Sequence, residues 1–593
     1  MKSLWDWLDS RTGIRHLAQE ALMEKIPGGA RWRYVWGSAL TFCLAIQFIT
    51  GLVLWAAYSP GAKSAWESVF YIQHEMAGGW FLRGLHHYTA QLMVVLLALH
   101  LMQVLIDGAY KAPREVNFWF GLALLMVTLG LALTGYLLPW DQKGYWATKV
   151  ATNIAAITPV FGSQIERLIV GGSDYGNLTL TRFFALHAGI LPGAIVVLVA
   201  GHIALFRRHG ITAKKPFRKP DANFWPDQVL MDAVAALAVV LTAVSLTLYF
   251  RGAELSAPAD PSEPYSAARP EWYFLFLFQF LKYFPGGTEV WGAIIIPSGV
   301  LGVMALMPIL GQWKLGHRFN LGFVGAILVG ALFLTFEAKL QDARDPEYRK
   351  AVEKAHRDSE RAVQLARSPT GIPEGGAALL LRRDPLTQGP RLFAQHCAGC
   401  HRFGGHDGLG NTLQEAASAP DLKGFGSREW LVGLLDPDKV ATVHYFGGTK
   451  FKDGKMVRFV QQKVAKYSEA KRADLAKVIL AVSAEAALPV QVELDVRDRA
   501  LIEEGRTLAR ESVNCTDCHQ FRKPDEDATA PDLTGWGSRE WLVAIISNPA
   551  HTRFYGKRND RMPAFAETGQ LDVEKIGVLA DWLRGDWYRA SAR

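Results

Sequence analysis

Two short motifs of the pattern C-x-x-C-H carry the clearest chemistry in the chain: CAGCH at 397–401 and CTDCH at 515–519. The cysteines of such a motif can bind haem c through thioether bonds, and the histidine can become the proximal iron ligand. A zinc site would need further cysteines, and a thioredoxin-like site would not explain the histidines. The residues predicted to hold two haem c groups are Cys397, Cys400 and His401 in the first motif and Cys515, Cys518 and His519 in the second.

Two methionines are candidates for the opposite side of these irons, because no other methionine follows residue 307. They are Met456 and Met562, one beyond each motif. The string NDRMPAF around Met562 resembles the ligand loop of class I cytochromes c, whereas KDGKMVRF around Met456 lacks the proline. A methionine ligand raises the reduction potential of a haem iron, which suits a carrier that receives electrons from a more reducing donor.

Four histidines lie in apolar segments of membrane-spanning length. His86 and His100 are fourteen residues apart, so they lie within ~40° of one helix face and ~21 Å from each other. His187 and His202 are fifteen apart, ~60° off one face and ~22 Å from each other. A single membrane histidine usually serves packing. Two matched pairs on two spans instead predict two bis-histidine haem b groups, one near each membrane face.

Glycines repeat this spacing in the two flanking apolar segments. Gly37 and Gly51 are fourteen residues apart, and so are Gly121 and Gly135. We predict that they leave room for the flat haem at both levels, because glycine lets the backbone approach closely. The alternative explanation is the ordinary packing of membrane helices through small residues.

The elements that must position these residues follow from composition and hydropathy. Half of the 593 residues are apolar, which argues against a wholly soluble protein, and a net charge of +8 is too small and scattered to indicate nucleic-acid binding. Seven segments are long enough to cross the ~30 Å apolar core of a membrane: 34–56, 86–106, 117–138, 183–206, 229–250, 290–310 and 320–337. We predict a mainly α protein, a seven-span transmembrane helical bundle with a haem-binding four-helix core, followed by two α-helical cytochrome c domains.

The basic residues predict the orientation of this bundle. The N-terminus and alternate loops hold 16 Lys and Arg in 73 residues, whereas the opposite loops hold 9 in 113. The N-terminus is therefore expected in the cytoplasm, and seven crossings put the chain after residue 337 on the outer side. Haem c is attached outside the cytoplasm, which agrees with this orientation. Residues 1–33 mix Trp and Leu with charges at helical spacing, as in a helix on the membrane surface or a cap on the bundle.

Residues 30–340 resemble the cytochrome b of the quinol-oxidising bc and bf complexes. The matching strings are LLPWDQKGYWATKV (137–150), LTRFFALHAGILP (180–192), APREVNFWFG (112–121) and PEWY (270–273). The step from His187 to His202 is similar to that of the chloroplast-like bf branch, in which a further haem is attached to a cysteine near the start of the first span. Val35 stands at that position here, so we predict no covalent haem in the membrane half.

The resemblance implies roles for residues that spacing alone does not single out. Arg83 and Arg114 match arginines that contact haem propionates in the family, although either could be an anchor at the membrane surface. Arg207 and Asp232 match positions near the cytoplasmic quinone site.

In the family, PEWY forms part of the outer quinol-oxidising site. The resemblance therefore implies that Glu271 accepts a proton from quinol, beside the aromatic Tyr273, and that Tyr136 faces the same pocket. An isolated glutamate after a proline could equally begin a helix, but four consecutive matching residues favour the site.

The C-terminal part contains an internal repeat. APDLKGFGSREWLV (419–432) and APDLTGWGSREWLV (530–543) match at twelve of fourteen positions, and each follows one C-x-x-C-H motif. Before the repeat, thirteen of the 26 residues at 342–367 are charged, which indicates a solvated helix. The predicted division is an amphipathic surface segment (1–33), a haem b four-helix domain (34–210), a three-span quinone-site domain (211–340), a charged linker (341–385) and two cytochrome c domains (386–490 and 491–593).

The function implied by the resemblance is that of a membrane subunit of a quinol:cytochrome c oxidoreductase. It would oxidise quinol on the outer side of a bacterial inner membrane and pass electrons through two b haems and two c haems, coupled to proton translocation. The implied partners are membrane quinol, a soluble acceptor such as cytochrome c, and a second copy in a homodimeric complex. A Rieske iron–sulfur protein must be separate, because haem c uses every cysteine after Cys43.

Three other functions stay open at the level of sequence. The chain could belong to a non-bifurcating quinol oxidase that passes both electrons outward. It could be the membrane haem anchor of another respiratory dehydrogenase, although such anchors have fewer spans and no PEWY. The haem c domains could also serve only docking or electron storage.

Overall fold

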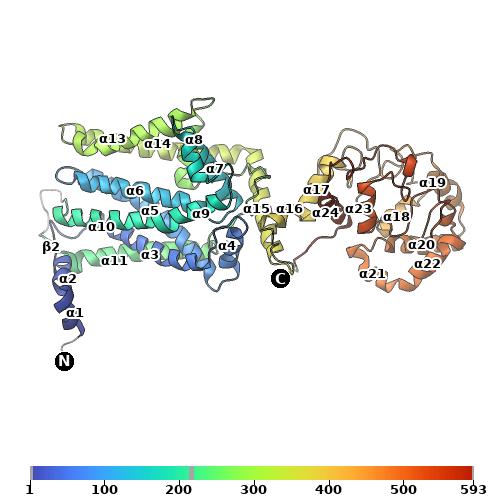
Figure 1. Cartoon of the computed structure of the whole chain (residues 1–593), viewed down its shortest axis with the longest axis horizontal. Helices are drawn as coiled ribbons and strands as arrows, with labels where there is room; N and C mark the ends of the chain where they lie inside the picture. The colour runs from blue at the N-terminus through green and yellow to red at the C-terminus, as the bar shows by residue number, and fades with distance from the viewer. Residues whose placement is uncertain (1–3, 213–219, 591–593) are drawn as a thin grey trace. The chain divides into compact units, whose positions relative to one another are not determined.

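Helices make up nearly all of the regular structure in residues 4–212 and 220–590, which the computed structural model describes (Figure 1). Within these residues the strands are β1 (Lys25–Ile26) and β2 (Ala222–Asn223), which pair antiparallel with Lys25 opposite Asn223. The chain divides into two compact units. The first consists of Met1–Ala366 with Ile372–Ala378, and the second of Arg367–Gly371 with Leu379–Arg593.

The first unit contains seven helical segments that are long and apolar enough to cross a membrane, which confirms the predicted number of spans. They are Trp32–Ala57, Gly79–Asp107, Glu115–Tyr136, Asn177–His209, Phe224–Tyr249, Trp291–Leu310 and Gly316–Arg344. Their main helices are α3 (Val35–Ala57), α5 (Gly79–Asp107), α6 (Glu115–Tyr136), α10 (Leu191–His209), α11 (Val229–Tyr249), α13 (Ile296–Leu310) and α14 (Gly316–Arg344). The last span, whose predicted segment 320–337 is the shortest of the seven, lies in one of the two longest helices described in the unit.

Apolar side chains on the outside of these helices suit a lipid environment. Val197 on α10 and Leu332 on α14 are each 71% exposed, and Ile49 on α3 is 65% exposed. Threonines inside the spans donate to their own helix, as Thr128 Oγ1 does to the carbonyl of Leu124 at 2.8 Å. These bonds satisfy hydroxyl groups where no water is available.

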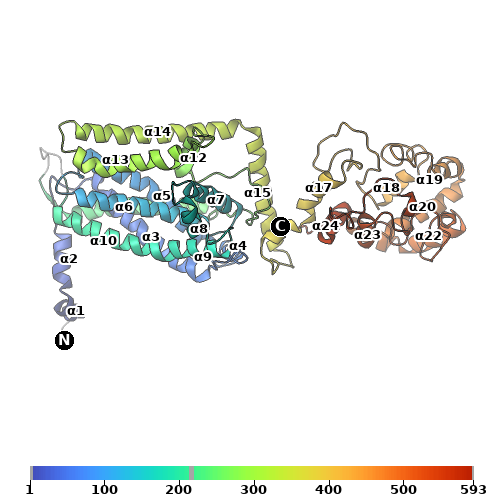
Figure 2. The ribbon, with the colours of Figure 1, turned by 45° about the horizontal axis from the view of Figure 1, so that its top comes forward.

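Four helices form the part of the bundle that carries the candidate ligands. α3 packs against α5, α6 packs against α10, and α11 covers α3 and α5. Shorter helices lie on the connections: α4 (Ala65–His74), α7 (Gln142–Ala156), α8 (Gly162–Val170) and α12 (Leu275–Leu281). α9 (Asn177–Ala185) instead begins the fourth span, which continues into α10. Figure 2 shows the long helices running side by side, with α7, α8 and α4 gathered near one end.

Both ends of the first unit carry helices with charged or exposed faces. α1 (Leu4–Thr12) and α2 (Ile14–Leu22) hold exposed apolar side chains such as Trp5, which is 62% exposed. α15 (Pro346–Ala366) forms in the charged segment after the last span, where the density of charge predicted a solvated helix.

The second unit contains the two copies of the repeat. Its helices are α16 (Ala378–Arg382), α17 (Pro385–His396), α18 (Arg428–Leu434), α19 (Lys455–Arg458), α20 (Glu469–Ala484), α21 (Val492–Arg497), α22 (Arg499–Glu511), α23 (Arg539–Ser547) and α24 (Val573–Arg584). The shared string folds alike in both copies. Trp430 Nε1 donates to the carbonyl of Asp421 at 3.0 Å, and Trp541 Nε1 donates to the carbonyl of Asp532 at 3.1 Å.

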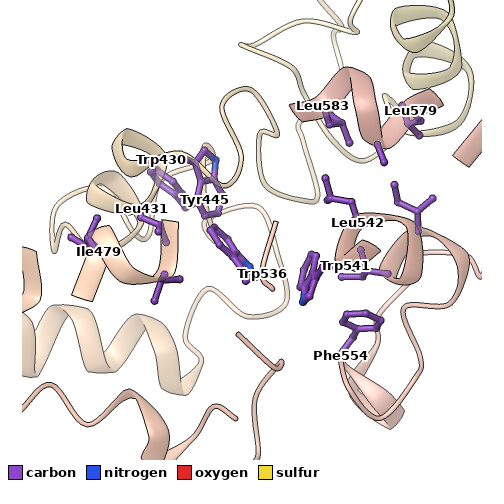
Figure 3. Packing of buried hydrophobic residues seen from close by; sticks show 14 of the residues in the cluster. Trp430, Leu431, Tyr445, Ile479, Trp536, Trp541, Leu542, Phe554, Leu579 and Leu583 are labelled. Atoms are coloured by element: carbon purple, nitrogen blue, oxygen red, sulfur yellow. The ribbon is translucent and has the colours of Figure 1, made fainter. Parts of the chain in front are cut away.

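One hydrophobic core joins the two copies. Figure 3 shows Trp536 of the second copy between Trp430 of the first copy and Trp541. The ring centres are 5.8 Å and 6.4 Å apart, which is contact distance for aromatic pairs. The two copies therefore fold as one body, with no solvent layer between them at this point.

Candidate haem and quinol sites

The four membrane histidines meet as two facing pairs. His86 on α5 faces His187 with 6.3 Å between ring centres, and His100 on α5 faces His202 on α10 with 6.4 Å. The structure therefore joins each histidine of one span to its predicted partner on the other.

Each predicted glycine lies against one of these imidazoles. A Cβ atom built on Gly51 would be 3.4 Å from His86 Cε1, and one on Gly37 would be 3.8 Å from His100 Cε1. On α6, a Cβ atom built on Gly135 would be 2.5 Å from His187 Cε1, and one on Gly121 would be 3.5 Å from His202 Cε1. The flanking helices α3 and α6 thus leave free space next to both histidine pairs.

Hydrogen bonds orient three of the four rings. The Nδ1 atoms of His187 and His202 donate to the carbonyls of Leu131 at 3.0 Å and Asn117 at 3.1 Å. His86 Nδ1 lies 2.8 Å from Thr50 Oγ1, whose own proton goes to a backbone carbonyl. A ring that donates from Nδ1 keeps the lone pair of Nε2 free for a metal. His100 Nδ1 has no partner among the described residues.

These distances fit an iron between each pair. Metal–imidazole bonds of ~2.0–2.1 Å on both sides of one ion give ring centres about 6.3 Å apart, close to the 6.3 Å and 6.4 Å found. Together with the glycines, the residues can hold a flat macrocycle with one axial histidine on each face.

The two predicted propionate arginines make contacts within the protein. Arg83 donates to the carbonyls of Ala253 at 2.9 Å and Glu254 at 2.7 Å, and also to the Gln73 side chain. Arg114 donates to the carbonyl of His209 at 2.7 Å, while its Nε has no partner among the described residues. Arg83 thereby ties α5 to the loop after α11.

Glu271 has a hydrogen-bond partner that the sequence did not predict. Its carboxylate accepts a hydrogen bond of 3.0 Å from Gln91 Nε2 on α5, and Gln91 Oε1 accepts one from the Trp272 indole. Glu271 also lies within electrostatic range of Tyr136 and Tyr273. The only sequence signal for Gln91 was a polar residue in an apolar span, five positions after His86.

Charged residues between α6 and α7 and in the loop after α11 hold these segments together. Asp141 accepts from the backbone N–H groups of Gly144 at 2.8 Å and Ser256 at 3.0 Å, and burial raises the pKa of this carboxyl. Lys143 and Glu254 form an ion pair of 2.5 Å. The loop after α6 and the loop after α11 are thereby fixed to each other.

At the opposite end of the bundle, the residues matched to a second quinone site lie in polar surroundings. Asp232 accepts hydrogen bonds from Ser38 Oγ at 2.7 Å and Gln228 Nε2 at 2.8 Å. Arg207 lies 4.0 Å from Glu24.

The histidines of both C-x-x-C-H motifs are held alike. His401 Nδ1 donates to the carbonyl of Pro420 and His519 Nδ1 to that of Pro531, both at 2.7 Å. Burial lowers the pKa of each imidazole, which favours the neutral form that can bind iron.

One cavity of about 640 Å³ contains the predicted residues of both haem c sites. The predicted residues that line it are Cys397, Cys400, His401, Met456, Cys515, Cys518, His519 and Met562. The rest of the lining is mostly aliphatic and aromatic, as an apolar macrocycle requires. The donors and the cavity therefore fit haem c, and two groups would share one chamber.

The two methionines differ in their local structure. Met562 lies in an irregular loop, and its carbonyl accepts a hydrogen bond of 2.9 Å from Asn559 Nδ2. Met456 lies in the short helix α19, because Val457 follows it where Pro563 follows Met562.

Family models match most of the chain. Residues 23–210 match cytochrome b/b6/petB, residues 258–339 match cytochrome b(C-terminal)/b6/petD, and residues 386–483 match cytochrome c.

Individual relatives agree with these family models. The menaquinol:cytochrome c reductase cytochrome b subunit of Bacillus subtilis is 40% identical over 220 residues, which is 36% of this chain and 98% of the relative. Cytochrome b6 of Synechococcus elongatus is 37% identical over 212 residues, 36% of this chain and 99% of the relative. A solved structure described as a hyperthermophilic respiratory Complex III matches with a TM-score of 0.50 and 28% identity, covering 59% of this chain and 93% of the other.

The glycine contacts lead to a first prediction. Gly135→Ala should lower the content of the haem held by His86 and His187, since the added Cβ would meet the His187 ring at 2.5 Å. Gly130→Ala on the same helix is the control, because its Cβ would be 3.6 Å from the flexible end of Leu191. Redox difference spectra of the b haems measure the effect. Full haem content in Gly135→Ala would mean that this glycine serves helix packing alone.

Proposed function

Because the chain belongs to the cytochrome b/b6 family and also holds a cytochrome c domain, we propose that it is the membrane electron-transfer subunit of a quinol:cytochrome c oxidoreductase. Residues 34–210 would form the haem b domain and residues 211–340 the rest of the quinone-binding part. The two copies at 386–490 and 491–593 would add two haem c groups on the outer side. The named relatives include a menaquinol:cytochrome c reductase subunit, which supports this assignment.

The observation that carries the proposal is the pair of facing histidines at each of two levels. His86 with His187 would hold the haem b nearer the outer side, and His100 with His202 would hold the inner one. Bound haem supplies one-electron transfer. The protein would contribute two facing histidines at each level, the space left by four glycines, and a connection between the two membrane faces through one helix bundle.

The quinol site is proposed at Glu271. Its carboxylate is held by Gln91 and lies near two tyrosines, so it can take a proton from a quinol hydroxyl while Gln91 keeps it oriented. Quinol would then give one electron to a Rieske protein and one to the haem b pair. The positive-inside count supports an outer location for this end of the bundle, so both hydroxyl protons of the quinol, one of them taken by Glu271, would be released there as the quinone forms.

The partners follow from the same arrangement. Four of the five cysteines lie in the C-x-x-C-H motifs and Cys43 is buried in α3, so a Rieske cluster must come from a separate subunit. A soluble acceptor such as cytochrome c would take electrons from the haem c groups. We place the complex in a bacterial inner membrane, with a cytoplasmic N-terminus and two copies of the chain.

The paired histidines give a second prediction. His86→Leu or His187→Leu should remove one b haem and leave the other, and His100→Leu or His202→Leu should do the reverse, because each pair serves one level. His87→Leu, next in the same helix, should keep both haems. Potentiometric titration of the b haems distinguishes the levels. The same haem lost from His86→Leu and His100→Leu would contradict the pairing.

Glu271 gives a third prediction, which tests the reaction itself. Glu271→Gln keeps the volume but removes the base, so quinol:cytochrome c reductase activity should fall about 100-fold or more, given general-base contributions of ~10²–10⁴. Glu289→Gln is the control, because Glu289 is exposed and accepts a hydrogen bond from Gly287 in its own loop. Haem content is measured in parallel. Wild-type turnover by a fully haem-loaded Glu271→Gln variant would leave Glu271 without a role in proton transfer.

The partner gives a fourth prediction. A Rieske iron–sulfur subunit should co-purify with the chain, and its removal should abolish quinol oxidation while all four haems remain. Electron paramagnetic resonance of the cluster and steady-state activity measure the two effects. Undiminished activity in a preparation free of iron–sulfur protein would favour a non-bifurcating quinol oxidase.

A further inference from the structure

The end helices of the two repeat copies pair crosswise. α17, which leads into the first C-x-x-C-H motif, packs against α24, the last helix of the second copy. α22, which leads into the second motif, packs against α20, the last helix of the first copy. Both Figure 1 and Figure 2 show these two pairs side by side. Each C-x-x-C-H motif therefore follows a helix that packs against the last helix of the other copy.

Close contacts make the first of these pairings specific. Trp582 on α24 stacks on Phe403, two residues after His401, with 4.2 Å between ring centres. It also contacts Phe393 on α17 at 5.5 Å, and Gly389 leaves it room, since a Cβ there would collide with the indole.

The second pairing is equally close. Ser512 lies three residues before Cys515, and its Oγ donates a hydrogen bond of 2.6 Å to Asp474 on α20. A Cβ at Gly505 on α22 would collide with the backbone of Lys477 on α20. Both attachment motifs are thus flanked by the C-terminal helix of the other copy.

The two copies pass each other at a pair of equivalent glycines. Gly426 and Gly537 occupy the same place in the shared string, and a Cβ on Gly537 would be 3.3 Å from Gly426 Cα. Both have positive φ, +87° and +75°, which glycine adopts readily. Beyond this point, Arg428 on α18 pairs with Asp495 and Asp498 at the start of the second copy, at 2.6 Å and 2.5 Å.

The segments that carry the two methionines also lie close to the motif of the other copy. Phe565, three residues after Met562, has its ring 6.2 Å from that of His396, which directly precedes Cys397. Three residues span at most ~11 Å of chain, so Met562 is within reach of the first motif. Tyr467, between Met456 and α20, packs against the same hydrophobic core as Cys515 of the second motif.

We propose that the two haem c sites are completed crosswise: Met562 ligates the iron held by His401, and Met456 ligates the iron held by His519. The proposal rests on the proposed function only in requiring haem c at both motifs. Both sites share one cavity lined by both methionines, so each methionine lines the same cavity as the motif of the other copy. Ligation within each copy would instead join Met456 to His401 and Met562 to His519.

Single-haem forms of the full-length chain distinguish the two arrangements. Replacing both cysteines of one motif by alanine leaves haem c at the other motif only. Met456→Ala or Met562→Ala is then added to each form. The readouts are the weak far-red band of methionine-ligated ferric haem and the midpoint potential, which a methionine ligand raises.

In the form that keeps Cys515 and Cys518, we expect Met456→Ala to abolish the band and lower the potential, and Met562→Ala to leave both unchanged. In the form that keeps Cys397 and Cys400, the effects should be exchanged. The opposite pattern in either form would overturn crosswise ligation. Absence of covalent haem at a motif of the unmodified chain would instead contradict the proposed haem c function.

If the single-haem forms do not fold, a single replacement that shifts the absorption band of one haem distinguishes the two arrangements. Cys400→Ala alone leaves one thioether, so a vinyl group stays conjugated and the α-band of this haem moves to longer wavelength. In the Cys400→Ala chain, Met562→His should lower the potential of the shifted band, and Met456→His that of the unshifted band. The reverse assignment would again overturn the proposal.

Discussion

The distance between two facing imidazoles governs the architecture of the membrane half. An iron with an imidazole on each face needs ring centres about 6.3 Å apart, and the structure provides this spacing at two levels. Two helices must therefore run side by side with little tolerance over both levels. The helices next to them must give up side chains at the same heights, which is where Gly37, Gly51, Gly121 and Gly135 lie. The spacing of the helices that carry the histidines and the placement of these glycines both agree with this requirement.

Polar contacts hold the loops around this bundle without adding charge to its apolar surface. Arg83 donates hydrogen bonds to two loop carbonyls, and Asp141 joins two loops by accepting from a backbone N–H group of each. Such bonds are strong where water is scarce, and a lost partner is costly there. The loops after α6 and α11 are thus tied to the bundle and to each other, which suits the quinol site that we propose at Glu271.

Sequence predicted the parts of the molecule that depend on short-range spacing. Histidines fourteen and fifteen residues apart had to share a helix face, and each C-x-x-C-H motif carries its own attachment chemistry. The spans were confirmed because apolar length is a local property. The Gln91 contact with Glu271 joins residues 180 positions apart, and no periodicity encodes it. The pairing of α17 with α24 could not be predicted for the same reason. In two similar copies, the first helix of one copy can pack against the last helix of either copy, and the sequence pattern is the same in both cases.

The crosswise packing of the second unit has a consequence for how the chain matures. α17 (Pro385–His396) lies far ahead in the sequence of the helix that covers it, α24 (Val573–Arg584). The first motif therefore stays uncovered until α24 has been made, which would leave time for haem to be joined to its cysteines before α24 packs against α17. It also ties the two copies together in evolution. Deleting either copy would remove the helix that packs on the helix before the other copy's motif, so loss of one half would no longer leave a complete single domain.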